Sequence, residues 1–279
     1  MIVGPTAVGK TDYSIELAKE YGSPVISCDS RQIYKEMRIG TAPPSEEQLA
    51  AVKHYFIFSH SVTQYYTAGK YELEALDLIN ELFKEHDRLV VVGGSGLYVD
   101  ALCYGLDDFP EADIALRNEL MARLESEGIE SLRLELKQLD PESYYSIDIA
   151  NRQRVVRALE VNLMTGRKFS SFKTNKVKER PFKINKIALN MPREKLYGRI
   201  NARVERMFDE GLVEEVERLT QYKDMPALQT VGYKEIFDYF DGKHSLEVAK
   251  ELIKRNTRRY AKKQISYFKR GDANWQVLT

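Results

Sequence analysis

The first residues of the chain could bind a phosphate group. They contain the pattern G-x-x-x-x-G-K-[ST], in which two glycines let the backbone turn so that successive amide N–H groups face one anion. Lys10 would place a positive charge near the terminal phosphate oxygens, and Thr11 would offer a hydroxyl to Mg²⁺. The helix that begins near Lys10 would add the positive end of its dipole. The residues predicted to bind a diphosphate or a nucleotide are Gly4, Pro5, Thr6, Ala7, Val8, Gly9, Lys10 and Thr11.

A carboxylate and a hydroxyl follow two of the predicted strands. The apolar run 24–28 places Asp29 at the carboxyl end of a strand, where ligands bind in an open α/β sheet. The buried-type strand 89–92 is followed by three glycines and Ser95. In most P-loop ATPases and GTPases an acid that holds Mg²⁺ follows such a strand, but no acid follows this one. Asp29 would therefore serve either as a metal ligand or as a general base, and the residues alone leave both roles open.

Strands alternate with helices over most of the chain, which is typical of a parallel α/β sheet. We expect strands at 24–28, 54–58, 89–92 and 182–189, and helices at 11–21, 45–52 and 67–86. The alternation stops between 110 and 165, where helices are expected at 111–126, 129–139 and 150–164. The sequence thus predicts a P-loop NTPase-like, three-layer core built from residues 1–109 and 181–279, with an α-helical insertion at 110–180. The first strand is shorter than usual, which suggests a natural chain that begins earlier.

Charge is balanced overall but segregated along the chain. The protein has 42 basic and 42 acidic residues, yet residues 151–186 carry eleven Lys or Arg against two Glu, and residues 254–270 carry eight Lys or Arg and no acid. In the second stretch the spacing is helical and puts Tyr260 and Phe268 on the apolar side, so we expect both rings in the core. Two basic blocks in a neutral protein indicate a local surface for a polyanion.

Several other classes of protein are excluded by composition. Two cysteines and four scattered histidines have no metal-ligand spacing, and the cysteines indicate a reducing compartment without a disulfide framework. There is no apolar run near twenty residues, no signal peptide and no lipidation motif. We expect a cytoplasmic, monomeric protein without a membrane partner.

Seven stretches in order resemble one family, the tRNA dimethylallyltransferases, also called tRNA isopentenyltransferases. The resemblance covers nearly the whole chain and is carried by residues 4–11, 27–34, 39–44, 92–98, 151–160, 231–235 and 259–264. The lack of a zinc-finger extension after them is similar to the bacterial members. The resemblance implies that a dimethylallyl group passes from dimethylallyl diphosphate to the exocyclic amine of the adenosine at tRNA position 37, beside the anticodon, with release of diphosphate.

The resemblance also implies residue roles. The P-loop would grip the leaving diphosphate together with Mg²⁺, Lys10 would stabilise its charge, and Asp29 would take the proton of the attacking amine. Ser95, where the family usually has Thr, and Arg117 would act beside the substrate. The residues expected to contact tRNA are Asp29, Ser30, Arg31, Gln32, Ser95, Arg117, Gln153, Arg154, Val155, Val156, Arg157, Leu228, Gln229, Thr230, Val231, Gly232 and Tyr233.

Three other functions remain open at this point. An adenylate isopentenyltransferase would modify a free nucleotide, but it would not need two basic blocks and a helical insertion. A small-molecule kinase would bind ATP in the loop and use Asp29 to activate a hydroxyl; the missing strand-end acid argues mildly against it. A non-catalytic RNA-binding protein would not need the intact Lys10, Thr11 and Asp29.

Overall fold

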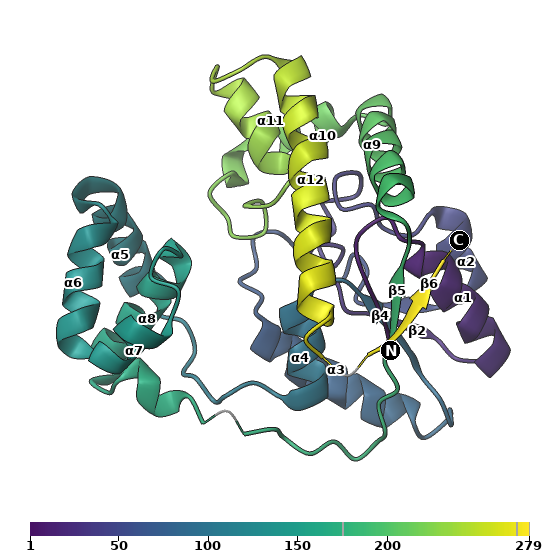
Figure 1. Ribbon diagram of the computed structural model, residues 1–279, viewed down its shortest axis with the longest axis horizontal. Helices are drawn as coiled ribbons and strands as arrows, with labels where there is room; N and C mark the ends of the chain where they lie inside the picture. Colours follow the sequence, from purple (N-terminus) through teal and green to yellow (C-terminus); the bar gives the residue numbers. More distant parts are fainter. Residues whose placement is uncertain (175, 272, 279) are drawn as a thin grey trace. The chain divides into compact units, whose positions relative to one another are not determined.

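The chain divides into two units in the computed structural model, which describes residues 1–174, 176–271 and 273–278. The larger unit comprises Met1–Tyr104 and Arg180–Thr279, and the smaller one comprises Gly105–Glu179 (Figure 1). The predicted insertion was 110–180, so the structure starts and ends the smaller unit slightly earlier. Each unit is described by itself.

Short apolar runs form one six-stranded sheet in the larger unit. The strands are β1 (Ile2–Val3), β2 (Val25–Ser27), β3 (His54–Tyr55), β4 (Val90–Gly93), β5 (Ile187–Asn190) and β6 (Asn274–Val277). Their order is β3-β2-β4-β1-β5-β6, and all neighbours are parallel. Because parallel strands end at the same edge, the P-loop after β1, Asp29 after β2 and Gly94 after β4 share one edge of the sheet. The predicted α/β fold class is confirmed.

Two strand predictions need correction, and one strand was not predicted. The strand expected at 54–58 ends at Tyr55, because Phe56 and Phe58 have φ values of 59° and 51°, which extended backbone does not adopt. The strand expected at 182–189 covers only Ile187–Asn190. The edge strand β6 was not predicted, and its Trp275 pairs with Ala188 of β5.

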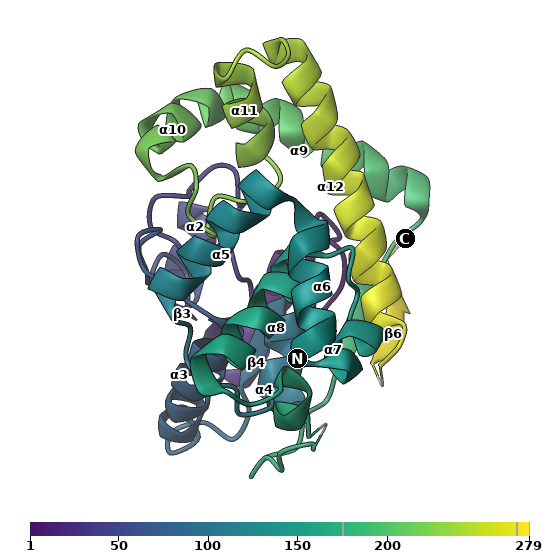
Figure 2. The ribbon, with the colours of Figure 1, turned by 90° about the vertical axis from the view of Figure 1, so that its left-hand side faces the viewer.

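The helices of the larger unit include those expected at 11–21, 45–52, 67–86 and 254–270, together with others for which no range was predicted. They are α1 (Lys10–Tyr21), α2 (Glu46–Ala51), α3 (Ala68–Leu82), α4 (Gly96–Tyr104), α9 (Arg193–Asp209), α10 (Leu212–Arg218), η2 (Thr220–Tyr222), α11 (Tyr233–Phe240) and α12 (Leu246–Phe268). Both views show α9 to α12 gathered at one end of this unit, with α12 running beside α9 and α11 (Figures 1 and 2). Their shared core includes Val204, Leu212, Ile236 and Ile253, and it also packs on Ile33 and Met37 of the loop after β2. This packing brings α9 and α12 to the functional edge of the sheet.

The smaller unit is helical, as the sequence predicts for this stretch. It contains α5 (Ile114–Glu127), α6 (Ile129–Leu139), α7 (Pro141–Ser146), α8 (Arg152–Thr165) and η1 (Phe169–Phe172). Leu120, Leu132, Leu136 and Leu159 are buried together in its core. Helix α7 was not predicted, because Asp140-Pro141 reads as a helix breaker; Asp140 instead caps α7, with Pro141 in the first turn.

Among the described residues, every helix is too short or too polar to span a lipid bilayer.

Candidate active site

The P-loop has the backbone conformation that its glycines predict. Gly4 and Gly9 have φ values of 144° and 104°, which residues with side chains rarely adopt. A Cβ on Gly4 would also lie 2.5 Å from the carbonyl oxygen of Leu189, so only glycine fits there. The Lys10 amino group donates hydrogen bonds to the carbonyl oxygens of Gly4 (3.1 Å) and Pro5 (2.8 Å). The loop therefore already surrounds the charge that would meet a phosphate.

Arginines from α9 converge on the P-loop. Arg203 Nη2 donates to Thr6 Oγ1 at 2.5 Å, whereas its buried Nε has no hydrogen-bond partner among the described residues. Burial lowers the pKa of Arg203 to about 10; Asp29 acts in the opposite direction, and the neighbouring Arg206 and Arg199 lower the pKa further. A buried cation with an unused donor and two like charges nearby is well suited to an anionic ligand.

Lys10 belongs to the same electrostatic cluster. Burial lowers its pKa to about 8, Asp29 opposes this change, and Arg203 lowers the pKa further. Two cations that share one poorly hydrated site repel each other and are stabilised by a multiply charged anion. The P-loop and α9 together thus form a site for a group such as a diphosphate.

Sequence reasoning missed the α9 arginines. Arg199, Arg203 and Arg206 are spaced four and three residues apart, so they lie on one helix face, and all three line the cleft described below. The acidic residues interspersed along the same helix hide this pattern when charge is simply counted. The helical spacing of basic residues was the available signal.

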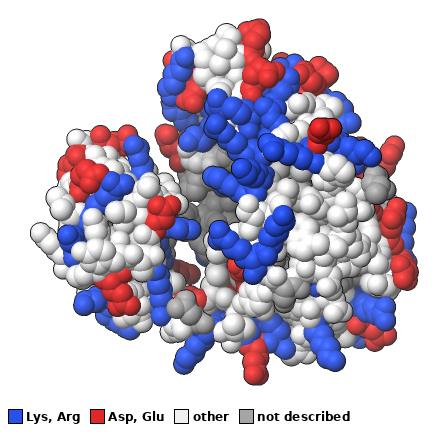
Figure 3. Space-filling view, viewed as in Figure 1, with Lys and Arg blue, Asp and Glu red and all other residues white. Residues whose placement is uncertain are grey.

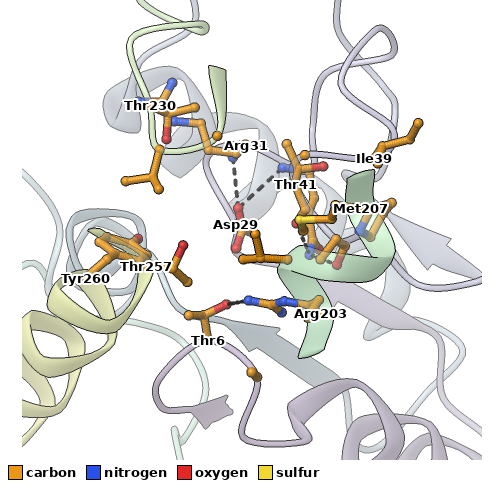
Figure 4. Close-up of a pocket in the computed structure, with 18 of the residues that line it drawn as sticks. Thr6, Asp29, Arg31, Ile39, Thr41, Arg203, Met207, Thr230, Thr257 and Tyr260 are labelled. Carbon is orange, nitrogen blue, oxygen red and sulfur yellow. Dashed lines mark hydrogen bonds between the residues drawn. The ribbon is translucent and has the colours of Figure 1, made fainter. Parts of the chain in front are cut away.

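Asp29 is held at the carboxyl end of β2. Its Oδ1 accepts hydrogen bonds from the backbone N–H groups of Arg31 (2.9 Å) and Gln32 (3.3 Å), as Figure 4 shows. Among the described residues no donor bonds Oδ2. One oxygen therefore fixes the turn, and the other is available to a ligand.

Ser95 bonds this turn, and Tyr260 lies in the same cleft. Ser95 Oγ accepts from the Ser30 N–H (2.9 Å) and donates to Ser30 Oγ (3.1 Å), but Ser95 itself does not line the cleft of the described residues. Tyr260 does line it and is 42% exposed, so its predicted core position is wrong, whereas Phe268 is buried as expected. Burial of the Tyr260 hydroxyl raises its pKa to about 12; Asp29 acts in the same direction, and a hydrogen bond with Ser95 opposes it.

Gln264 of α12 joins two of the strand ends and received no role from the sequence. Its Oε1 accepts from the Thr6 N–H and its Nε2 donates to the Gly94 carbonyl oxygen, both at 2.8 Å. Its side chain fills the space that a Cβ on Gly94 would need. The glycines at the end of β4 thus leave room for other atoms of the protein itself. The Gln264 side chain packs against Gly94, and the Cys28 backbone packs against Gly93.

These groups open into one cleft of about 1770 Å³ in the larger unit (Figure 4). Arg31 Nη1 donates to the carbonyl oxygens of Pro226 and Ala227, each at 3.1 Å, which holds the segment before α11 beside the turn after β2. The residues predicted to contact tRNA that line the cleft are Asp29, Ser30, Arg31, Gln32, Gln229, Thr230, Val231 and Gly232. Thr6, Ala7, Gly9, Lys10 and Thr11 of the P-loop line it too, whereas Gly4, Pro5 and Val8 are buried below.

Five residues predicted to contact tRNA have buried side chains. Ser95, which bonds the turn after β2, is 8% exposed. Leu228 and Tyr233 are fully buried among α9 to α12, and Val155 and Val156 are buried in the core of the helical unit. The protein itself covers these side chains, and tRNA contact at these positions stays a prediction. In α8 and in the segment 228–233, the buried side chains face the core, whereas adjacent residues of the same segments are exposed.

The other predicted residues of the helical unit fall into two groups. Gln153 and Arg154 are exposed on α8. Arg117 and Arg157 both bond the fully buried Glu160, at 2.5 and 2.7 Å. Their charges thus stabilise the helical unit, and the expected role of Arg117 beside the substrate stays a prediction.

Positive side chains gather over α12 on the face of the larger unit seen in Figure 3. Arg255, Arg259 and Lys263 of this helix are exposed and line the cleft. Part of the first basic block has another use: Arg180 bonds the buried Glu72 at 2.8 Å. Charge counted along the chain therefore overstates the free positive surface near residue 180, whereas the second basic block does form an exposed positive surface on α12.

Comparisons with known proteins agree along nearly the full chain. A family model described as IPP transferase matches residues 32–271. The tRNA dimethylallyltransferase 1 of Bacteroides thetaiotaomicron is 47% identical over 98% of this chain and 88% of its own length. The tRNA dimethylallyltransferase of Cytophaga hutchinsonii is 48% identical over 99% and 91%, respectively.

Solved structures lead to the same family. The full-length tRNA isopentenylpyrophosphate transferase of Bacillus halodurans aligns with a TM-score of 0.70 and 40% identity, over 99% of this chain and 88% of that one. A eukaryotic dimethylallyltransferase described as acting on tRNA aligns with a TM-score of 0.81 and 26% identity, over 99% and 72%. The chain therefore belongs to the tRNA dimethylallyltransferases, the IPP transferase family of enzymes that transfer a dimethylallyl group to tRNA.

Proposed function

We propose that this protein transfers the dimethylallyl group of dimethylallyl diphosphate to the exocyclic amine of adenosine 37 in tRNA. The observation that carries the proposal is the composition of one cleft. The buried cations Lys10 and Arg203 lie in it near the carboxylate of Asp29, which partly opposes the lowering of both pKa values by burial. One part of the cleft thus suits a leaving diphosphate, and another can take a proton.

The diphosphate end is supported by the P-loop and α9. As the bond between the dimethylallyl carbon and the diphosphate oxygen breaks, negative charge grows on that oxygen. Lys10 and Arg203 are already dehydrated and close to it, so they stabilise the charge with little reorganisation. Thr6 fixes the Arg203 guanidinium through their hydrogen bond.

The acceptor end is supported by the turn after β2. The amine nitrogen forms a bond to the dimethylallyl carbon, the diphosphate leaves with its electron pair, and the amine loses one proton. Asp29 is the base that takes this proton, with the oxygen that bonds neither Arg31 nor Gln32. An adenine amine is weakly basic, so it needs such a positioned base as the new bond forms.

We also propose Mg²⁺ as a cofactor. The described residues contain no cluster of three or more His, Cys, Asp or Glu side chains that could hold a metal by themselves. Thr11 lines the cleft beside Lys10, and Mg²⁺ in phosphate sites typically takes few protein ligands, with phosphate oxygens and water completing its shell. The residues therefore fit an ion held by Thr11 and the diphosphate, where it would neutralise charge on the leaving group.

The RNA surface that we propose includes the basic residues of α12 in the cleft and the segment Gln229–Gly232. Gln153 and Arg154 of the helical unit offer a second exposed contact. Extrusion of the target base from the anticodon loop would let its amine reach Asp29. We propose that the enzyme acts as a cytoplasmic monomer, in the compartment of its tRNA substrate.

The testing experiment incubates the protein with Mg²⁺, labelled dimethylallyl diphosphate and either unmodified tRNA or AMP. Label on tRNA alone is expected. Label on AMP would favour adenylate isopentenyltransferase, and ATP-dependent phosphorylation of a small alcohol without prenyl transfer would favour a kinase. Arg203→Gln should abolish most transfer, whereas Arg193→Gln, an exposed position at the start of the same helix, should not.

A further inference from the structure

A buried carboxylate stands outside the proposed reaction site. Glu215 of α10 is 3% exposed and accepts four hydrogen bonds. Three come from successive backbone N–H groups, those of Arg38 (2.8 Å), Ile39 (2.8 Å) and Gly40 (3.0 Å), and the fourth comes from the Tyr233 hydroxyl (2.7 Å). Among the described residues, neutral groups thus provide all of its hydrogen bonds. Such an arrangement resembles the way backbone nests hold an anion, with the anion supplied by the protein itself.

The turn that Glu215 holds forms one wall of the cleft. Ile39, Gly40, Thr41 and Ala42 all line it. The turn is tightly fixed: a Cβ on Gly40 would lie 2.6 to 2.7 Å from the Tyr233 ring, and Ala42 has a φ of 48°. Tyr233 was predicted to bind tRNA, but the structure places it beneath this wall, in contact with both the turn and Glu215.

Gln32 connects the same turn to Asp29. Its side-chain amide donates to the carbonyl oxygens of Thr41 (3.3 Å) and Ala42 (2.9 Å). Its backbone N–H donates to Asp29 Oδ1 (3.3 Å). A continuous series of hydrogen bonds therefore runs from Glu215 through the turn and Gln32 to the carboxylate of Asp29.

We propose that Glu215 is a positioning residue for prenyl transfer: it fixes the turn 38–42 and, through Gln32, the orientation of Asp29 toward the target amine. This inference rests on the proposed function, in which Asp29 is the base. The diphosphate site is built on other elements, since Lys10 and Arg203 belong to α1 and α9. Glu215 should therefore affect the transfer step more than the binding of dimethylallyl diphosphate.

The physical reason lies in the donors that face Glu215. Glu215→Gln keeps the shape but removes the charge and turns one acceptor into an NH₂ group, which would face N–H or O–H donors. Buried donors left without an acceptor are costly, so the turn would shift to find other partners. A displacement of about 1 Å at a reacting group can lower a rate by roughly 100-fold.

The experiment compares wild type with Glu215→Gln, Tyr233→Phe and Glu72→Gln. The last is the matched control, because Glu72 is a buried carboxylate of the same unit, 4% exposed, bonded to Arg180 away from the turn. Single-turnover transfer to tRNA gives the rate, calorimetry with dimethylallyl diphosphate in the absence of tRNA gives its affinity, and thermal unfolding gives stability. Tyr233→Phe removes one hydrogen bond and keeps the carboxylate, so it tests the proposal even if Glu215→Gln fails to fold.

We expect the rate to fall roughly 10- to 100-fold in Glu215→Gln and about threefold or more in Tyr233→Phe, with dimethylallyl diphosphate affinity nearly unchanged. Glu72→Gln should lose stability without a comparable loss of rate. The proposal is overturned if both test variants transfer at the wild-type rate, or if their rate losses match that of Glu72→Gln at equal loss of stability. A wild-type protein that transfers no label contradicts the proposed function instead.

Discussion

The buried amino group of Lys10 should make the binding of dimethylallyl diphosphate depend on pH. Its pKa in the ligand-free protein is about 8 instead of 10.5, mainly because of burial and partly because of Arg203. Below pH 8 the lysine is charged and ready for the diphosphate. Above pH 8 the free protein holds a neutral lysine, which must regain a proton when the anion binds.

The size of the effect follows from this pKa. Each pH unit well above 8 should cost about tenfold in affinity, or about 1.4 kcal/mol, so affinity should fall about 25-fold between pH 7.5 and 9.5. The ionisation of dimethylallyl diphosphate does not add to this pH dependence, because the last ionisation of an organic phosphate lies near pH 6. Isothermal titration calorimetry without tRNA measures binding without transfer.

Three variants identify the titrating group. Lys10→Met should bind weakly and show a flat profile, whereas Lys19→Met, an exposed position on the same helix, should keep the wild-type profile. Arg203→Gln removes a positive neighbour, so the pKa of Lys10 should rise. The pH above which affinity declines should then be higher. A wild-type affinity that stays constant from pH 7.5 to 9.5, or the same decline in Lys10→Met, would refute the electrostatic account of this site.

Four further changes separate chemistry, RNA contact and packing. Asp29→Asn should lower single-turnover transfer about 10²- to 10⁴-fold and tRNA affinity far less; normal turnover with lost binding would exclude the base role. Arg154→Gln should weaken tRNA binding and reduce the slope of log affinity against log salt by about 0.7 to 0.9, and an unchanged slope would place the RNA surface elsewhere. Arg157→Gln should instead lower the melting temperature, because the buried Glu160 loses a partner; a stable variant would contradict this. Leu228→Ala should cost about 2–5 kcal/mol in urea unfolding, and a small cost would show that its burial matters little.

Much of the site could be predicted from the sequence because its parts are local. The P-loop is contiguous, and Asp29 follows directly on a recognisable strand, so the parallel direction of the strands brings both to one edge of the sheet. Alternation of strands and helices likewise predicts the parallel sheet, and the stretch where this alternation stops predicts the helical unit. These inferences need neighbours in sequence, not contacts across the fold.

The remaining parts depend on packing that a sequence does not display. Arg203 and Gln264 reach Thr6 from about 200 and 260 residues away, and only the docking of α9 and α12 reveals them. The burial of Val156 depends on which face of α8 meets its neighbours, and that of Leu228 on how the turn before α11 packs on the core. Strand 54–58 ends early for a similar reason: the positive φ of Phe56 is imposed by its surroundings, against its intrinsic preference.

The connectivity of the sheet has a consequence for synthesis on the ribosome. In the centre of the sheet Ile2 lies opposite both Val92 and Ile187, so the first strand cannot gain its second neighbour until most of the chain has been made. The unit Gly105–Glu179 is helical and local in its contacts, and it is complete by then. Domains fold as units during translation, and local contacts form faster than distant ones. A nascent chain should therefore carry a folded helical unit before Gln264 has been synthesised and can bond the P-loop. The cleft should form only near the end of translation.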